Sequence, residues 1–235
     1  LVRSRGLGDV YKRQDIPRVE MNELDAEYRS HTRLEEGNLG LTKEQAMQEA
    51  QRCLDCPNPT CMQGCPVSIN IPTFVKNIER GEFLEAARVL KETSALPAVC
   101  GRVCPQEKQC ESKCIHLKMG KPAVAIGYLE RFAADYERES GNISIPEVAE
   151  KNGIKIAVVG SGPAGLSFAG DMAKRGYDVT VFEALHEIGG VLKYGIPEFR
   201  LPNKIVDVEI EGLRKMGVKF MTNCIVGKTI SYDDL

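Results

Sequence analysis

The spacing of apolar residues along the chain changes once, near residue 153. Before that point apolar residues recur every three or four positions, which is typical of amphipathic helices. Thr42 followed by Gln45 forms a capping box at the start of the first of these helices. The helices that this spacing predicts cover residues 42–52, 72–80, 82–92 and 122–139. We therefore expect a helical domain without strands at residues 41–139.

After residue 153 the apolar positions form short continuous runs rich in β-branched residues, which is typical of buried parallel strands. Amphipathic stretches alternate with these runs, and this order predicts a parallel α/β sheet. The expected strands cover residues 154–159, 178–183 and 218–222, and the expected helices cover 163–175 and 204–216. The sequence thus predicts an α-helical domain followed by an α/β Rossmann-like domain.

Polar stretches set the expected domain limits. Residues 1–14 begin without Met and lack a periodic apolar pattern, so they are typical of a cloning leader or of a disordered native tail. Residues 15–40 are polar and are expected to form an extended arm. The predicted division is a leader and arm at 1–40, a helical domain at 41–139, a linker at 140–153, and an α/β part at 154–235.

Composition argues against several classes of partner. The 235 residues carry a formal net charge of −2, so nothing favours binding to nucleic acid or to an anionic membrane. No apolar run approaches the ~20 residues of a membrane span. The first 30 residues also lack the apolar core of a signal peptide. We therefore expect a cytoplasmic protein whose cysteines serve metal or redox chemistry rather than disulfides.

The distribution of cysteines is the strongest chemical signal, because eight of the nine lie between residues 53 and 114. The first group has the spacing C-x2-C-x4-C-x3-C and is followed by Pro66, and the second has the spacing C-x3-C-x5-C-x3-C. The groups are Cys53, Cys56, Cys61 and Cys65, then Cys100, Cys104, Cys110 and Cys114. Eight neighbouring thiolates would repel one another unless soft cations or iron–sulfur clusters bind among them.

Iron–sulfur clusters and zinc are the alternatives for these cysteines. The spacing closed by Pro66 is nearer to the ferredoxin type, in which the last cysteine of the run binds the other cluster. Zinc sites favour paired knuckles and often include His, and the only histidine near the cysteines is His116. A non-enzymatic module whose zinc knuckles mediate subunit contacts therefore stays an alternative. Cys224 lies outside every motif and is expected to be a buried apolar residue.

A glycine-rich segment with the pattern G-x-G-x-x-G follows the first expected strand and opens a helix. Its residues are Gly160, Ser161, Gly162, Pro163, Ala164 and Gly165. In this context the first glycine permits a tight turn, the second lets the backbone approach a pyrophosphate, and the helix start offers free N–H groups. Glu183 ends the next strand, where a carboxylate binds ribose hydroxyls and repels a 2′-phosphate. We therefore expect this unit to bind FAD or NAD rather than NADP.

The cysteine segment 53–130, the glycine-rich segment, and the stretches EALHEIGG at 183–190 and KYGIPEFRLP at 193–202 together resemble a known family. They are similar to the small subunit of NADPH-dependent glutamate synthase. They are also similar to the corresponding modules of dihydropyrimidine dehydrogenase and of the large subunit of ferredoxin–NADP transhydrogenases. The resemblance covers about residues 40–235. It implies a helical domain with two 4Fe–4S clusters, followed by the first part of an FAD-binding domain.

The same resemblance implies an activity. NADPH would reduce FAD, and electrons would leave singly through the clusters to a large glutamate synthase subunit or to another electron-accepting subunit. The product would be glutamate made from glutamine and 2-oxoglutarate; a transhydrogenase or a pyrimidine-reducing complex is the alternative. In the family the NADPH-binding domain and the part that completes the FAD site come later, so we expect this chain to be a fragment.

The resemblance also implies the site residues. The ligands of one cluster would be Cys53, Cys56, Cys61 and Cys114, and those of the other would be Cys65, Cys104, Cys110 and Glu130. The residues that would contact the flavin nucleotide are Val103, Gly190, Val191 and Arg200. The pair Gly189-Gly190 favours FAD in this βαβ unit.

Glu130 is the least expected of these ligands, because Cys100 would complete a quartet by spacing alone. A surface glutamate in a helix usually has a cation three or four residues away. The positions so related to Glu130 are small or apolar, namely Ile126, Gly127, Ala133 and Ala134. We therefore predict that Glu130 faces a packed site and that Cys100 stays unligated.

Overall fold

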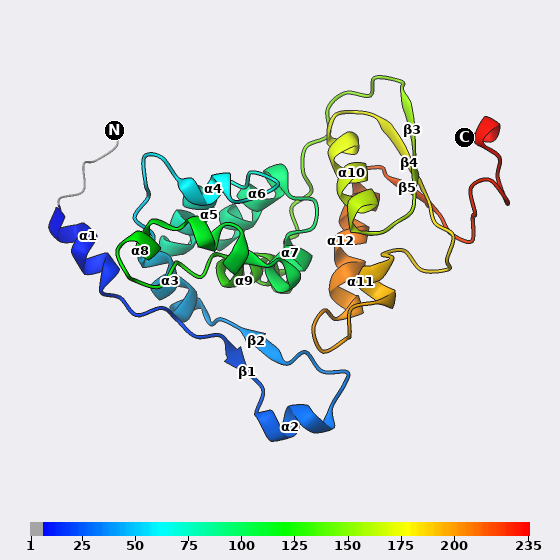
Figure 1. Ribbon diagram of the computed structural model, residues 1–235. Coiled ribbons are helices and arrows are strands. Elements are labelled where there is room, and N and C mark those ends of the chain that lie inside the picture. The colour runs from blue at the N-terminus through cyan, green and yellow to red at the C-terminus, as the bar shows by residue number, and fades with distance from the viewer. Residues whose placement is uncertain (1–6) are drawn as a thin grey trace. The chain divides into compact units, whose positions relative to one another are not determined.

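The computed structural model describes residues 7–235, so residues 1–6 of the expected leader lie outside the described range. Contacts divide the described chain into two units (Figure 1). The first holds the residues up to 24, 38–93 and 100–143, and the second holds 25–37, 94–99 and 144–235. None of the described helices is long and apolar enough to cross a membrane. The predicted domain limits stay a prediction.

The first unit is built mainly from helices, as the apolar spacing predicts. Their bounds are α1 Leu7–Gln14, α3 Lys43–Gln51, α4 Thr60–Gln63, α5 Ile71–Glu79, α6 Phe83–Thr93, α8 Ile115–Lys118 and α9 Ile126–Ser140. Of the second cysteine group, Cys100 lies in α7 (Pro97–Val103) and Cys104 directly follows it. Cys110 lies between the 3-10 turns Gln106–Lys108 and Glu111–Lys113, and Cys114 directly precedes α8. α5 packs on α3 and α6, and α6 packs on α9.

Sequence signals at the helix ends are confirmed. The Thr42 side chain accepts a hydrogen bond from the backbone N–H of Gln45, and the Gln45 side chain accepts one from the backbone N–H of Thr42. Gly81 separates α5 from α6 with a φ of +81°, a conformation that glycine adopts without steric cost. The core between the helices includes Phe74 and Leu129, both 0 % exposed.

The residues before α3 differ from the predicted extended arm. β1 (Asn22–Glu23) pairs antiparallel with β2 (Asn38–Gly40), and α2 (Ala26–His31) lies between them in the sequence. The Asp25 carboxylate caps α2 by accepting hydrogen bonds from two backbone N–H groups of its first turn. No residue of α2 is buried, so no apolar stripe marks this helix in the sequence. Both strands lie before residue 41, so the expectation of a helical domain without strands at 41–139 is confirmed.

α9 begins at Ile126, later than the predicted start at Pro122. The carbonyl groups of Pro122 and Ala123 both accept hydrogen bonds from the Arg52 guanidinium. Those carbonyls belong to a segment without regular secondary structure, and their partner lies far away in the sequence. Tertiary hydrogen bonds therefore decide where this helix starts, which helix propensity alone did not reveal.

The second unit contains a three-stranded parallel sheet in the order β3-β4-β5. Its strands are β3 Lys155–Val159, β4 Asp178–Phe182 and β5 Lys219–Met221. Its other helices are α10 Pro163–Lys174, α11 Val191–Tyr194 and α12 Asn203–Lys215, with a 3-10 turn at Tyr232–Asp234. α10 connects β3 to β4, packs on β4 and contacts α12 (Figure 1). The predicted βαβ unit is confirmed.

β3 is less buried than predicted. Val158 is 7 % exposed, whereas its neighbour Val159 is 60 % exposed. Side chains of a strand alternate between the two faces of the sheet, and a Cβ built on Gly165 of α10 would lie 3.4 Å from Val158. Helix α10 therefore covers the face with Val158, and the opposite face of β3 is exposed within residues 7–235. The expectation of a buried strand is therefore wrong for this face of β3.

Candidate functional site

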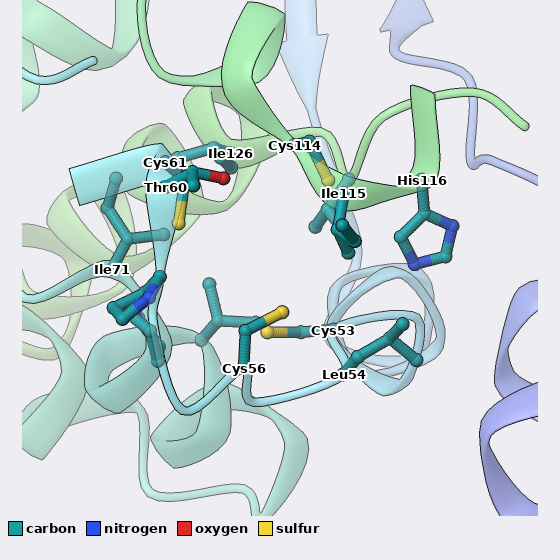
Figure 2. A pocket seen from close by; sticks show the side chains of 14 residues that line it. Cys53, Leu54, Cys56, Thr60, Cys61, Ile71, Cys114, Ile115, His116 and Ile126 are labelled. Carbon is teal, nitrogen blue, oxygen red and sulfur yellow. The ribbon is translucent and has the colours of Figure 1, made fainter. Parts of the chain in front are cut away.

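Four cysteines from different segments of the first unit line one pocket (Figure 2). Cys53 follows α3 and Cys56 lies in the next loop, whereas Cys61 lies in α4 and Cys114 precedes α8. Their sulfur atoms point toward a common space in Figure 2. About 430 Å³ of the pocket lies outside protein atoms, part of it open to solvent. The structure thus brings together the four cysteines expected to bind one cluster.

The wall of this pocket is otherwise largely apolar and includes Ile71, Val75, Val124 and Ile126. Burial raises the pKa of the Cys53 thiol to about 11, although the Lys76 ammonium opposes the increase. Burial, together with the charges of Cys53 and Cys114, raises the pKa of Cys61 to about 12. These thiols are therefore protonated at neutral pH in the absence of metal, and metal binding must release their protons.

A second group of thiols interacts with the carboxylate of Glu130. Burial, together with the charges of Glu130 and Cys65, raises the pKa of Cys104 to about 11. Burial also raises the pKa of Cys110, followed by the charges of Glu111 and Glu130. Cys110 is 6 % exposed and Glu130 is 5 % exposed. The structure therefore brings Glu130 near the thiols expected to bind the other cluster.

Cys100 lies in α7, and its backbone carbonyl accepts a hydrogen bond of 2.9 Å from the side-chain amide of Gln106. The charge of Glu130 raises the pKa values of both Cys104 and Cys110. The choice between Glu130 and Cys100 as the ligand stays a prediction.

His116 lies beside the first pocket, but its ring is hydrogen-bonded to the backbone. Its Nε2 is 2.9 Å from the carbonyl oxygen of Arg52. Because a carbonyl only accepts, the ring proton is assigned to Nε2. Burial lowers the pKa of His116, which favours this neutral form. The nitrogen Nε2 therefore cannot serve as a zinc ligand while this bond is present.

Residues 7–235 contain no group of three His, Cys, Asp or Glu side chains close enough to share a single metal ion. In a 4Fe–4S cluster each cysteine binds a different iron atom, so the ligands surround the cluster rather than converge on one point. The four thiols surround one pocket, as the ligands of such a cluster do, and their soft sulfur donors suit iron. The residues present therefore fit an iron–sulfur cluster.

The glycine-rich loop joins β3 to α10, and Pro163 occupies the first position of that helix. Gly160 has a φ of +96°, which favours glycine. A Cβ on Gly165 would lie 2.1 Å from the carbonyl oxygen of Gly160, so this close approach of helix and strand requires glycine. A Cβ on Gly190 would lie 2.9 Å from the Cα of Gly162, so the later Gly189-Gly190 turn packs on the first loop.

Glu183 is hydrogen-bonded into this loop and is 7 % exposed. One carboxylate oxygen accepts a bond of 2.9 Å from the backbone N–H of Ser161 and another from its hydroxyl, and the second oxygen accepts one of 2.9 Å from the N–H of Leu185. Burial raises the pKa of Glu183, but these hydrogen bonds outweigh it and hold the pKa below its ordinary value. The Ser161 hydroxyl in turn accepts a bond of 3.0 Å from the N–H of Gly189. Glu183 and Ser161 thus connect the two glycine turns.

The other residues expected at the flavin lie in different places. Val103 ends α7 and is partly buried, Val191 begins α11 and is 54 % exposed, and Arg200 is exposed before α12. Their contact with a flavin nucleotide, like the binding of ribose by Glu183, stays a prediction. Cys224 is 6 % exposed, so the expectation of a buried residue there is confirmed.

Two charged residues beside the cysteines are absent from the sequence prediction. Lys76 is 7 % exposed, and its ammonium donates a bond of 2.7 Å to the carbonyl of Cys53. Its spacing from Glu79 is typical of an exposed pair on a helix, so the sequence did not indicate burial. Arg52 is 0 % exposed and directly precedes the first cysteine, which is the one signal that could have drawn attention to it.

Known protein families match the two parts of the chain separately. Residues 29–142 match the family described as "Dihydroprymidine dehydrogenase domain II, 4Fe-4S cluster". Residues 158–217 match the family described as "NAD(P)-binding Rossmann-like domain". The expected order of an iron–sulfur domain and a Rossmann-like domain is therefore confirmed.

Curated relatives cover most of this chain but extend beyond it. The NAD-dependent dihydropyrimidine dehydrogenase subunit PreT of Escherichia coli (strain K12) is 40 % identical over 202 residues, which are 86 % of this chain and 48 % of PreT. The glutamate synthase (NADPH) small chain of the same strain is 40 % identical over 192 residues, which are 81 % of this chain and 40 % of the relative. The glutamate synthase (NADPH) small chain of Azospirillum brasilense is 36 % identical over 192 residues, which are 82 % of this chain and 40 % of that relative. The chain thus spans about half the length, or less, of these relatives. It belongs to the family that contains the glutamate synthase (NADPH) small chains and the PreT subunits, with a 4Fe–4S domain followed by an NAD(P)-binding Rossmann-like domain.

Proposed function

We propose that this chain is the electron-transfer part of an NADPH-dependent oxidoreductase, with two 4Fe–4S clusters in its first unit and FAD in its second. The observation that carries the proposal is the pocket on which Cys53, Cys56, Cys61 and Cys114 converge from separate segments. When bound, the clusters would supply one-electron transfer, which no amino-acid side chain in the pocket provides.

The protein's own residues would hold the clusters and keep water away from them. In the first pocket the four thiols would bind iron after losing their protons, and apolar residues such as Ile71 and Val75 would limit the access of solvent. In the second group the ligands would be Cys65, Cys104, Cys110 and Glu130. The carboxylate of Glu130 is 5 % exposed, so iron coordination would compensate its burial.

FAD in the second unit is supported by the two glycine turns. Gly162 lies at the start of α10, where backbone N–H groups and the helix dipole stabilise a pyrophosphate. Among the described residues no atom lies within 4 Å of a Cβ built on Gly162, so the backbone is open to a ligand there. Glu183 would accept hydrogen bonds from ribose hydroxyls in addition to those that it accepts from Ser161 and Leu185.

The reaction that we propose for the whole protein is the formation of glutamate from glutamine and 2-oxoglutarate, with NADPH as the reductant. Its partner would be a large glutamate synthase subunit. The second candidate is the reduction of pyrimidines with a different partner subunit, because a PreT subunit is as similar to this chain, at 40 % identity, as a glutamate synthase small chain. The third candidate reaction for the same module is electron transfer between ferredoxin and NADP.

Anaerobic purification followed by analysis of iron, acid-labile sulfide, zinc and flavin tests the proposal. We expect broad visible absorption with about eight iron and eight sulfide per chain, the content of two 4Fe–4S clusters. Zinc without sulfide would refute the clusters and favour an interaction module. Addition of each candidate partner subunit to the reduced protein then decides the acceptor, since the correct partner reoxidises it and the other does not.

A further inference from the structure

The two groups of cysteines have different charged neighbours. Beside the first pocket, the ammonium of Lys76 is 2.7 Å from the carbonyl oxygen of Cys53. Lys76 is 7 % exposed and belongs to α5, which also supplies apolar residues to the pocket wall. A cation is therefore fixed against the backbone of a proposed ligand and is shielded from water.

Buried carboxylates lie beside the second group of cysteines. Glu111 directly follows Cys110 and is 6 % exposed, and one of its oxygens accepts a bond of 3.1 Å from the N–H of Gly127. Its other oxygen pairs with Arg18 at 2.8 Å, and the Arg18 side chain is 27 % exposed and thus more accessible to solvent. A buried carboxylate thus directly follows a proposed ligand of the second group, whereas a buried ammonium contacts a proposed ligand of the first.

We propose that Lys76 sets the order of electron uptake: it makes the cluster held by Cys53, Cys56, Cys61 and Cys114 the more easily reduced of the two. This inference rests on the proposed function, because it presupposes that both clusters are present. Reduction adds one electron and forms or breaks no bond, so the reduced cluster carries one more negative charge. A fixed cation nearby stabilises that state, and carboxylates destabilise it.

Glu79 opposes the charge of Lys76, because its carboxylate pairs with the Lys76 ammonium. The Glu79 side chain is 18 % exposed and that of Lys76 is 8 % exposed, so water screens the carboxylate more than the cation. Glu79 also pairs with the Arg13 guanidinium at 2.8 Å, so two cations share this one carboxylate, and the carboxylate residue beside Cys56, Asp55, is exposed. The positive charge therefore dominates at the pocket. Removal of the Lys76 charge should make the midpoint potential of this cluster more negative, and removal of the Glu79 charge should make it less negative.

Redox titration with dithionite, followed by electron paramagnetic resonance on the anaerobic whole protein, tests this assignment. In Lys76→Met one of the two midpoint potentials should become more negative, with the reduced state at least tenfold less populated at a given potential, or about 59 mV for one electron. The other potential should stay unchanged. In Glu79→Gln the same potential should become less negative, and Lys76→Arg should restore the wild-type value.

Lys91→Met is the matched control, because Lys91 also belongs to the first unit and pairs with a carboxylate, Glu137, at 2.5 Å. It should leave both potentials unchanged. Unaltered potentials in Lys76→Met and Glu79→Gln, with full iron content, would overturn the inference while the proposed function stands. If Lys76→Met loses iron, the Glu79→Gln variant tests the inference by itself: a less negative midpoint potential supports the inference, and an unaltered one overturns it. Absence of iron and sulfide from the wild-type protein would instead refute the proposed function.

Discussion

Removal of the buried carboxylate of Glu49 should destabilise the cysteine unit far more than removal of an exposed carboxylate. Glu49 and its partner Arg52 are 0 % exposed, and their closest side-chain atoms are 2.6 Å apart. Glu49 also accepts hydrogen bonds from the backbone N–H groups of Val19, at 2.7 Å, and Ala125, at 2.8 Å. The carboxylate thus holds together the segment before β1, the end of α3 and the start of α9.

Glu49→Ala leaves the Arg52 guanidinium buried without its ion pair, which costs about 3–5 kcal/mol. The two backbone N–H groups also lose their acceptor, at about 1–3 kcal/mol for each that water cannot reach, so we expect the upper part of the first range. For a chain of this size about 1 kcal/mol lowers the melting temperature by roughly 2–4 °C. The melting temperature should therefore fall by roughly 8–20 °C.

Thermal unfolding followed by circular dichroism, with iron content matched between samples, measures this difference. Glu85→Ala is the control, because Glu85 pairs with Arg88 at 2.5 Å and the two side chains are 45 % and 54 % exposed. It should change the stability by no more than about 0.5 kcal/mol. Hydrogen exchange should accelerate at the Val19 and Ala125 amides in Glu49→Ala and not in the control. Equal melting temperatures for the two variants would refute the reasoning.

Three further predictions concern the ligands and the nucleotide loop. Cys100→Ser should keep full iron content, whereas Glu130→Ala should alter the spectrum or potential of one cluster. If Cys100→Ser loses a cluster and Glu130→Ala changes neither spectrum nor potential, the ligand assignment is reversed. Glu183→Ala should weaken flavin binding by about one to two orders of magnitude, because a charge-assisted hydrogen bond contributes about 1.5–3 kcal/mol; unchanged flavin retention in gel filtration would remove Glu183 from the site. The metal-free protein should lose stability above pH 9, because the folded state raises the pKa of Cys53 to about 11 and of Cys61 to about 12. A pKa that is raised in the folded state stabilises the protein fully below the pKa of the unfolded state, and this stabilisation disappears as the pH rises through the pKa of the folded state. Urea unfolding should therefore have a lower midpoint at pH 10.5 than at pH 8. Equal midpoints at the two pH values would contradict the prediction.

The sequence determined the chemistry because that information is local. Cysteine spacing indicated soft-metal ligands, and the G-x-G-x-x-G segment between a strand and a helix indicated a nucleotide loop. Thr42 and Gln45 marked a helix start that the structure confirms. Each of these signals depends on residues a few positions apart, where backbone geometry alone sets their relation.

The tertiary structure decided which side chains meet. Spacing alone divides the cysteines into two consecutive quartets, but the fold brings Cys114 to the pocket of Cys53 and sets Cys65 beside Cys104. It also buries Lys76 beside a cysteine, although its spacing from Glu79 is that of a surface pair. These relations depend on chain segments that are distant in sequence and come together by burying apolar helix faces. A pattern of nearby residues therefore names the chemistry, and only long-range packing assigns its partners and its charges.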